Sequence, residues 1–231
     1  MPLRDHFRPP LSTRRHWHAF HNSWATYLSS DINTQLPRGY FAEANVQFNI
    51  EIDVATFEEG SPESISGWPC PAPAQQVPIT LVTDSVEIQV FSAGGGPTLA
   101  GAVELVSPAN KDRPDTRDAF VSKCAAYLQQ GVGLAIVDVV TERSANLHDE
   151  LMTRLRAVEA VRPAALLYAA SYRPVNHDGR TVLDLWHERC EIGQPLPTLP
   201  LWLRSGFCLR LELEATYERT CREQRVLANG D

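Results

Sequence analysis

Two short apolar segments, residues 102–106 and 134–140, flank a turn and a helix-like stretch near the middle of the chain. Each segment has the length of a strand and is rich in β-branched residues, as in strands covered on both faces of a sheet. Between them, Pro114 is suited to open a helix and Gly131 to follow its last turn. The pattern therefore predicts a strand–helix–strand unit with both strands buried.

Each predicted strand carries one carboxylate, Glu104 or Asp138, and the helix carries Lys123 between the apolar positions Phe120 and Tyr127. A buried ionised carboxylate costs several kcal/mol unless it is paired or bound to a metal. Residues one helical turn apart share a face, so Lys123 lies at the border of the apolar stripe. We expect Lys123 to meet Glu104, either as a structural salt bridge or as part of a site.

The pattern over residues 1–57 predicts an extended arm, a helix, and one or two strands in which apolar and polar residues alternate. Residues 1–11 are basic and contain prolines, which predicts an extended arm, and Ser12 or Thr13 can cap a helix that continues to about residue 36. His18 and His21 share a face of this helix, which leaves metal binding open beside packing and capping, the favoured interpretation. Residues 40–57 then alternate as a half-covered strand or strand pair, and Asp53 stands where the pattern becomes fully apolar.

Residues 58–78 are polar and rich in proline, which predicts a loop or flap. Strands at 79–83 and 86–91 and a glycine turn at 94–97 should follow. Glu87 alternates with apolar neighbours, so it is expected to face solvent, with the site as the alternative.

The pattern after residue 140 predicts that residues 141–231 form a C-terminal extension that contains a hairpin and a helix. A helix at 146–158 precedes a strand at 164–172, a turn at 176–179 and a partner strand at 181–192. A rigid connector at 195–200, an edge strand at 209–213 and a polar helix at 214–227 complete it. We predict one domain, 1–231, of the α/β (α+β) class, with a central mixed β-sheet flanked by helices.

Composition narrows the partners and the setting. The 231 residues carry a formal net charge of −7, so a nucleic-acid partner requires a local basic patch, and nothing draws the chain to an anionic membrane. Five scattered cysteines without a C-x-x-C pair fit a reduced cytoplasmic setting. We expect no signal peptide and no bilayer span. A homo-oligomer is compatible with the sequence.

Three strand carboxylates (Asp53, Glu104 and Asp138) with a helix lysine suggest a site for a divalent metal. Mg²⁺ prefers oxygen ligands and retains several waters, so two carboxylates suffice. A neighbouring lysine can then orient or deprotonate the water that attacks a phosphate.

Three segments carry a family resemblance: IDVATFE at 52–58, AVELVSPANK at 102–111 and FVSKCAAYLQQGVGLAIVDVV at 120–140. They resemble a bacterial family of unknown function with an E-L-x-SPANK hallmark, which is similar to the PD-(D/E)xK, restriction-endonuclease-like superfamily. The resemblance implies a nuclease-like core at about 40–140.

The resemblance implies that Asp53 and Glu104 bind Mg²⁺ or Mn²⁺. The usual lysine two residues after the glutamate is replaced by Val106, and no proline precedes Asp53. Lys123 matches a displaced lysine followed by a tyrosine, here Tyr127, and Lys111 is the competitor.

A metal-dependent phosphodiesterase acting on nucleic acid is the leading hypothesis, with Arg113, Arg117 and Lys111 contacting phosphate. The alternatives are a non-catalytic binding or interaction module in which the same residues form ion pairs, and an enzyme that processes nucleotides or other small phosphate esters.

Overall fold

The computed structural model describes residues 1–48, 50–58, 67–79, 98–157, 165–177 and 180–226. The elements follow one another in this order: α1 (Trp17–Gln35), β1 (Tyr40–Phe48), β2 (Ile50–Glu58), β3 (Gln75–Pro78), β4 (Thr98–Leu105), α2 (Pro108–Asp112), α3 (Pro114–Gln129), β5 (Gly133–Asp138), α4 (Leu147–Arg154), β6 (Tyr168–His177), β7 (Arg180–Arg189), β8 (Thr198–Trp202), β9 (Cys208–Glu212) and α5 (Leu213–Glu223).

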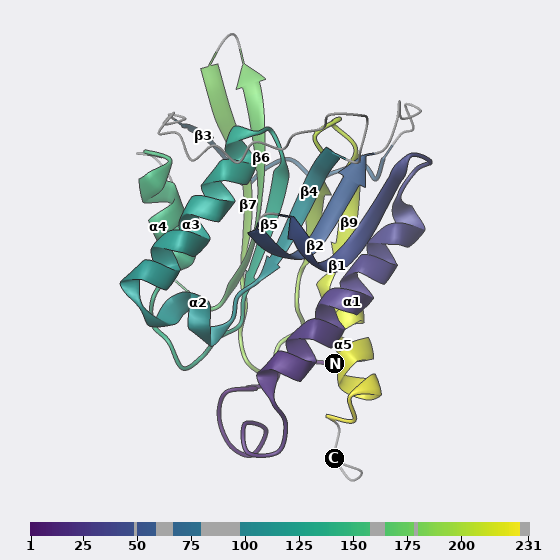
Figure 1. The fold of residues 1–231 in the computed structure, drawn as a ribbon, viewed down its shortest axis with the longest axis vertical. Coiled ribbons are helices and arrows are strands. Elements are labelled where there is room, and N and C mark those ends of the chain that lie inside the picture. The colour runs from purple at the N-terminus through teal and green to yellow at the C-terminus, as the bar shows by residue number, and fades with distance from the viewer. Residues whose placement is uncertain (49, 59–66, 80–97, 158–164, 178–179, 227–231) are drawn as a thin grey trace.

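A mixed sheet forms the centre of the molecule, with the strand order β1-β2-β4-β5-β6-β7-β3 (Figure 1). β4 and β5 run parallel, because helix α3 carries the chain back between them. The other neighbouring strands of this sheet pair antiparallel. The predicted central mixed sheet flanked by helices is therefore confirmed.

Two apolar clusters cover the two faces of the sheet. Helices α3 and α4 pack on one face, through side chains such as Phe120, Leu128 and Leu151. Helices α1 and α5 and the β8–β9 hairpin pack on the other, through Trp24, Tyr217 and Leu201. Because alternate residues of β4 enter different clusters, Glu104 points toward α3 while its neighbours Val103 and Leu105 point toward α1.

Two facing glycines let the β8–β9 hairpin approach the sheet closely. Gly101 on β4 is in register with Gly133 on β5. A Cβ added at Gly133 would lie 1.9 Å from the carbonyl oxygen of Trp202, whereas one at Gly101 would meet the end of the Leu203 side chain at 2.9 Å. The close backbone contact therefore requires glycine at position 133.

The N-terminal arm contacts the rest of the domain more closely than the sequence predicts. The 1–11 arm packs against the domain: Leu3 exchanges backbone hydrogen bonds with Gly193 and Gln194, and His6 Nε2 lies 2.7 Å from the Tyr217 hydroxyl. α1 begins at Trp17 rather than directly after residues 12 or 13.

Two predicted irregular segments contain strands. Within the expected loop 58–78, Gln75–Pro78 forms β3 on β7, and within the expected connector 195–200, Thr198 begins β8. Both strands lie at a sheet edge, where proline is tolerated. In the described part of the chain, no helix has the length and apolar character needed to span a bilayer.

Candidate metal-binding site

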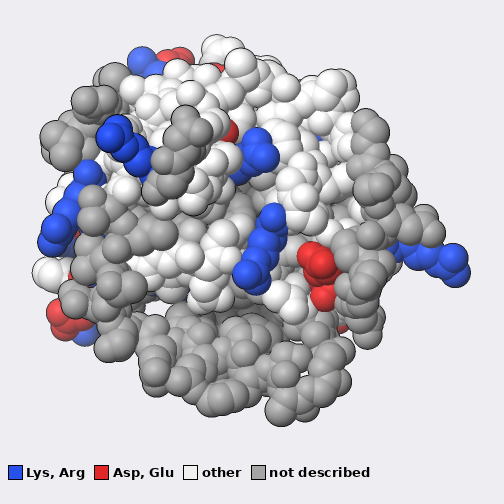
Figure 2. Space-filling model, turned by 90° about the horizontal axis from the view of Figure 1, so that it is seen from above, with Lys and Arg blue, Asp and Glu red and all other residues white. Residues whose placement is uncertain are grey.

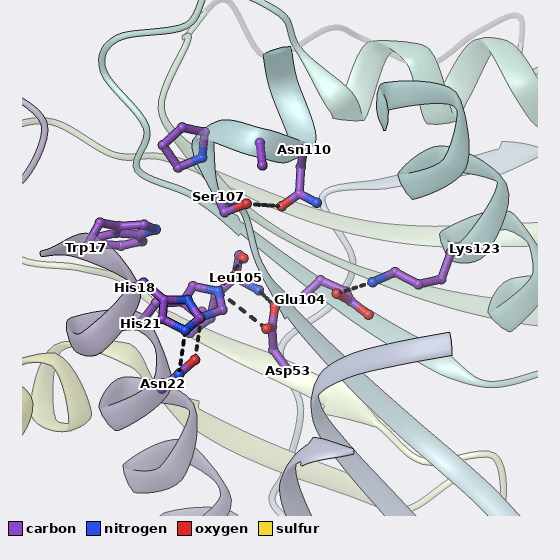
Figure 3. Close-up of a pocket in the computed structure, with 12 residues that line it drawn as sticks. Trp17, His18, His21, Asn22, Asp53, Glu104, Leu105, Ser107, Asn110 and Lys123 are labelled. Carbon is purple, nitrogen blue, oxygen red and sulfur yellow. Dashed lines mark hydrogen bonds and ion pairs between the residues drawn. The ribbon is translucent and has the colours of Figure 1, made fainter. Parts of the chain in front are cut away.

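Asp53 on β2 and Glu104 on β4 lie side by side. Val54 pairs with Val103 in the antiparallel register, which brings Asp53 and Glu104 next to each other and onto the same face. Both residues are buried. The backbone N–H of Leu105 donates to Asp53 Oδ2 at 2.6 Å, which fixes the aspartate against the neighbouring strand. Two carboxylates that are 51 positions apart in the chain thus line one pocket (Figure 3).

Lys123 on α3 reaches Glu104 as the sequence predicts. Its ammonium donates to Glu104 Oε2 at 2.7 Å, while Glu104 Oε1 has no hydrogen-bond partner in the described structure. Burial raises the pKa of Glu104 to about 7, against the lowering effect of Lys123, and nearby Asp53 raises it further. Burial lowers the pKa of Lys123, but Glu104 outweighs it and the net pKa is raised. Lys123 therefore remains an ammonium at neutral pH.

His21 on α1 is a site residue for which the sequence favours packing or capping and leaves metal binding open. Its Nε2–H donates to the Leu105 carbonyl at 2.8 Å and lies 3.3 Å from Asp53 Oδ1. Burial lowers the pKa of His21, but the bonds and charge of Asp53 outweigh this and raise it to about 9. The imidazole is therefore a cation at neutral pH. The sequence feature that could have indicated this role is the spacing of four residues from Trp17, which places both side chains on one face of the helix.

The pocket around these groups has a volume of about 450 Å³. α1 contributes Trp17, His18 and His21, and the turn after β4 contributes residues 107–110 (Figure 3). In that turn, Asn110 Oδ1 accepts from both the backbone N–H and the hydroxyl of Ser107, at 2.8 Å each. This capping bends the chain into α2 and turns Lys111 inward.

Lys111 and Asp138, two possible site residues, form a separate buried ion pair outside the lining of this pocket. Lys111 Nζ donates to Asp138 Oδ2 at 2.8 Å, with both side chains fully buried. Asp138 Oδ1 also accepts the N–H of Val140 at 3.1 Å. Burial raises the pKa of Asp138 to about 6, although Lys111 lowers it. Of the two competing lysines, Lys123 is therefore the one that contacts Glu104.

The remaining predicted site residues are Tyr127, Arg117, Arg113 and Glu87, and none of them lines the pocket in the described structure. Tyr127 is buried, and burial followed by the charge of Glu104 raises its pKa well above the usual range. Arg117 is paired with Glu150 at 2.9 Å, and Arg113 is exposed at the start of α3. Glu87 lies outside the described residues.

The oxygen donors of the pocket suit a hard divalent cation. Among the described residues, no group of three or more His, Cys, Asp or Glu is arranged to hold a metal. Mg²⁺ needs fewer protein ligands, because it retains waters. Glu104 offers a buried oxygen without a hydrogen-bond partner, and Asp53 and the Leu105 carbonyl are adjacent oxygen donors. These groups fit Mg²⁺ or Mn²⁺ provided that His21 gives up its contact with them.

No family model, curated protein or solved structure matches this chain.

Proposed function

We propose that this chain is a Mg²⁺- or Mn²⁺-dependent phosphodiesterase that acts on nucleic acid and resembles the PD-(D/E)xK nucleases. The observation that carries the proposal is the convergence of Asp53, Glu104 and Lys123, from three separate elements, on one pocket. Two neighbouring carboxylates can hold the metal that assists phosphate ester hydrolysis, and an amine beside them can donate hydrogen bonds to the reacting groups. A pair of carboxylates alone is compatible with many metal-dependent functions. The amine that contacts Glu104 favours hydrolysis of a phosphate ester among them.

The side chains would divide the chemistry between binding and orientation. Asp53 and Glu104 would hold the cation, which when bound lowers the pKa of its water and polarises the phosphate. Lys123 keeps its proton, so it would orient water or stabilise charge on a phosphate oxygen by donating hydrogen bonds. His21 contacts Asp53 and the Leu105 carbonyl from the opposite side, and it would release them as the cation binds.

The test is cleavage of a supercoiled plasmid and of a labelled oligonucleotide in the presence of Mg²⁺ or Mn²⁺. We expect wild type to cleave both and Glu104→Gln and Lys123→Met to lose at least about 100-fold of the rate, the scale of losing one key polar group at a reacting phosphate. Glu150→Gln is the matched control, because it makes the same change in the partly exposed pair with Arg117. Equal cleavage by wild type and Glu104→Gln would remove the catalytic assignment.

A non-catalytic binding module is the second candidate, and one observation favours it. The protein itself supplies a cationic partner for each carboxylate, because Lys123 forms an ion pair with Glu104 and His21 contacts Asp53. Calorimetric titration with Mg²⁺ and Mn²⁺ separates the two candidates. Binding heat that disappears in Asp53→Asn supports the enzyme, whereas no heat in wild type, with strong destabilisation by Lys123→Ala, supports the module.

A further inference from the structure

A second pocket, of about 420 Å³, lies where the N-terminal segment meets the end of α5. Apolar side chains, among them Leu11, Ile192 and Val226, form part of its wall. Four arginines and a single acidic residue also line it: Arg4, Arg14, Arg15, Arg225 and Asp5. This concentration of positive charge is unexpected in a chain with a net charge of −7.

The one acidic group in this arginine pocket is already engaged. Asp5 Oδ1 accepts the backbone N–H of Phe7 at 3.0 Å and the hydroxyl of Thr141 at 2.7 Å. Its Oδ2 lies 3.7 Å from the guanidinium of Arg8, which is outside the pocket lining. Arg8 therefore offsets part of the negative charge of Asp5, and the four lining arginines outnumber this one carboxylate.

The arginines, in contrast, retain donors. Arg15 uses two N–H groups on the carbonyls of Arg14 and Arg225, and a guanidinium has five. Arg4, Arg14 and Arg225 form no ion pair with any acidic residue in the described part of the chain. Arg14, Arg15 and Arg225 are also exposed. A ligand rich in phosphate would satisfy these groups, because arginine forms charge-assisted, often bidentate bonds with phosphate oxygens.

The arginine pocket is continuous in sequence with the candidate metal-binding site. Arg15 lines the first and Trp17 the second, and their Cα atoms are separated by two peptide units, at most about 7.6 Å. One nucleic acid strand places a phosphate at roughly every 3.4 Å of helix axis. A strand with one phosphate near Glu104 would thus bring further phosphates to the arginines within a few nucleotides.

The opposite end of the molecule offers no comparable cluster on its visible surface. Figure 1 places the N-terminal segment at the bottom, and Figure 2 views the molecule from the top. Among the described residues visible there, lysines and arginines stand singly rather than together. Of the basic residues that the sequence predicted to contact phosphate, Arg117 is paired with Glu150 and Lys111 is buried against Asp138.

We propose that the arginine pocket binds the phosphate backbone of a polynucleotide strand whose next phosphates occupy the Asp53–Glu104 site. This inference rests on the proposed phosphodiesterase function and adds a second site where the chain would hold the polymer, outside the reacting centre. The pocket is the local basic patch that an acidic protein needs to hold a polyanion.

Binding is tested without cleavage, in the Glu104→Gln background, by fluorescence anisotropy of a labelled 20-nucleotide single strand across a series of salt concentrations. Arg14→Gln/Arg15→Gln should weaken binding roughly tenfold or more at 0.05 M salt and lower the slope of log K against log salt by about 1.4, since each single-strand phosphate contact contributes about 0.7. Arg14→Gln alone, at an exposed side chain, keeps the test valid if the double variant folds poorly.

The matched control is Arg38→Gln/Arg180→Gln, which removes the same charge at two exposed arginines. Arg38 follows the far end of α1, about 28 Å along the helix from the pocket. An equal loss in both double variants, or no loss in either, would overturn the inference.

Hydrolysis of bis(p-nitrophenyl) phosphate with Mn²⁺ separates this inference from the proposed function. The arginine variant should hydrolyse this small ester at the wild-type rate while its KM for the oligonucleotide rises. If no substrate is cleaved but binding depends on Arg14 and Arg15, the phosphodiesterase proposal fails and the binding site stands. If both substrates are cleaved and binding ignores these arginines, the binding site fails and the function stands.

Discussion

The proton on Glu104 gives the sharpest test of the site, because its pKa of about 7 lies well above the ordinary value of 4.5. The physical cause is burial, which the contact with Lys123 offsets only in part. Glu104→Gln keeps the shape of the side chain and an oxygen that can accept from Lys123. It removes the proton equilibrium and leaves the two neighbouring strands in place.

The sign of the effect follows from the direction of the shift. Between pH 4.5 and about 7, the unfolded chain has released the Glu104 proton while the folded chain still holds it. The free energy of unfolding of wild type therefore falls as pH rises through this window. At about 1.4 kcal/mol for each pKa unit, the loss amounts to roughly 3 kcal/mol. Glu104→Gln lacks this loss, so its stability relative to wild type should rise by about that amount.

Urea unfolding of both proteins at a series of pH values measures the difference directly. Glu150→Gln controls for the loss of an acid, since Glu150 lies in a partly exposed ion pair. Identical pH dependence in wild type and Glu104→Gln would show that Glu104 is not a buried carboxyl with a raised pKa. Mg²⁺ added above pH 7 should stabilise wild type and not the variant, because only the ionised carboxylate binds the metal.

Three further outcomes follow from the described contacts. Lys111→Met leaves Asp138 buried without its partner and should cost about 3–5 kcal/mol in urea unfolding; an unchanged midpoint would contradict it. Gly133→Ala places a methyl group against the Trp202 carbonyl and should cost at least about 3 kcal/mol, seen as a large drop in Tm. The His21 imidazole should titrate near pH 9 by NMR, and a midpoint below 6.5 would disprove its contact with an ionised carboxylate.

The central unit of the fold could be predicted because its signals are local. Pro114 opens α3, and Gly131 follows its last turn with a φ of 78°. Burial of a charged residue in a strand demands a partner, and this reasoning alone led from Glu104 to Lys123. The same reasoning applied to Asp138 predicted a third site carboxylate, but it did not identify Lys111 as the partner.

The parts that escaped prediction depend on contacts between distant segments. The role of His21 requires the start of α1 to lie against the end of β4, 84 residues later in the chain. Strands β3 and β8 contain prolines, and only their pairing with β7 and β9 identifies them as strands. Tertiary contacts and strand pairings of this kind produce no periodic pattern of apolar residues in a single sequence.

The balance of charge explains how a buried acidic pair persists in this fold. Asp53 and Glu104 lie beside one another, and neither could remain ionised in a dry interior without compensation. Two cations supply it, His21 at Asp53 and Lys123 at Glu104, and both have raised pKa values. A divalent cation would bring the same compensation in a single ion and would draw the proton from Glu104. Metal affinity should therefore rise with pH through about 7, and His21 would have to release Asp53 as the metal binds.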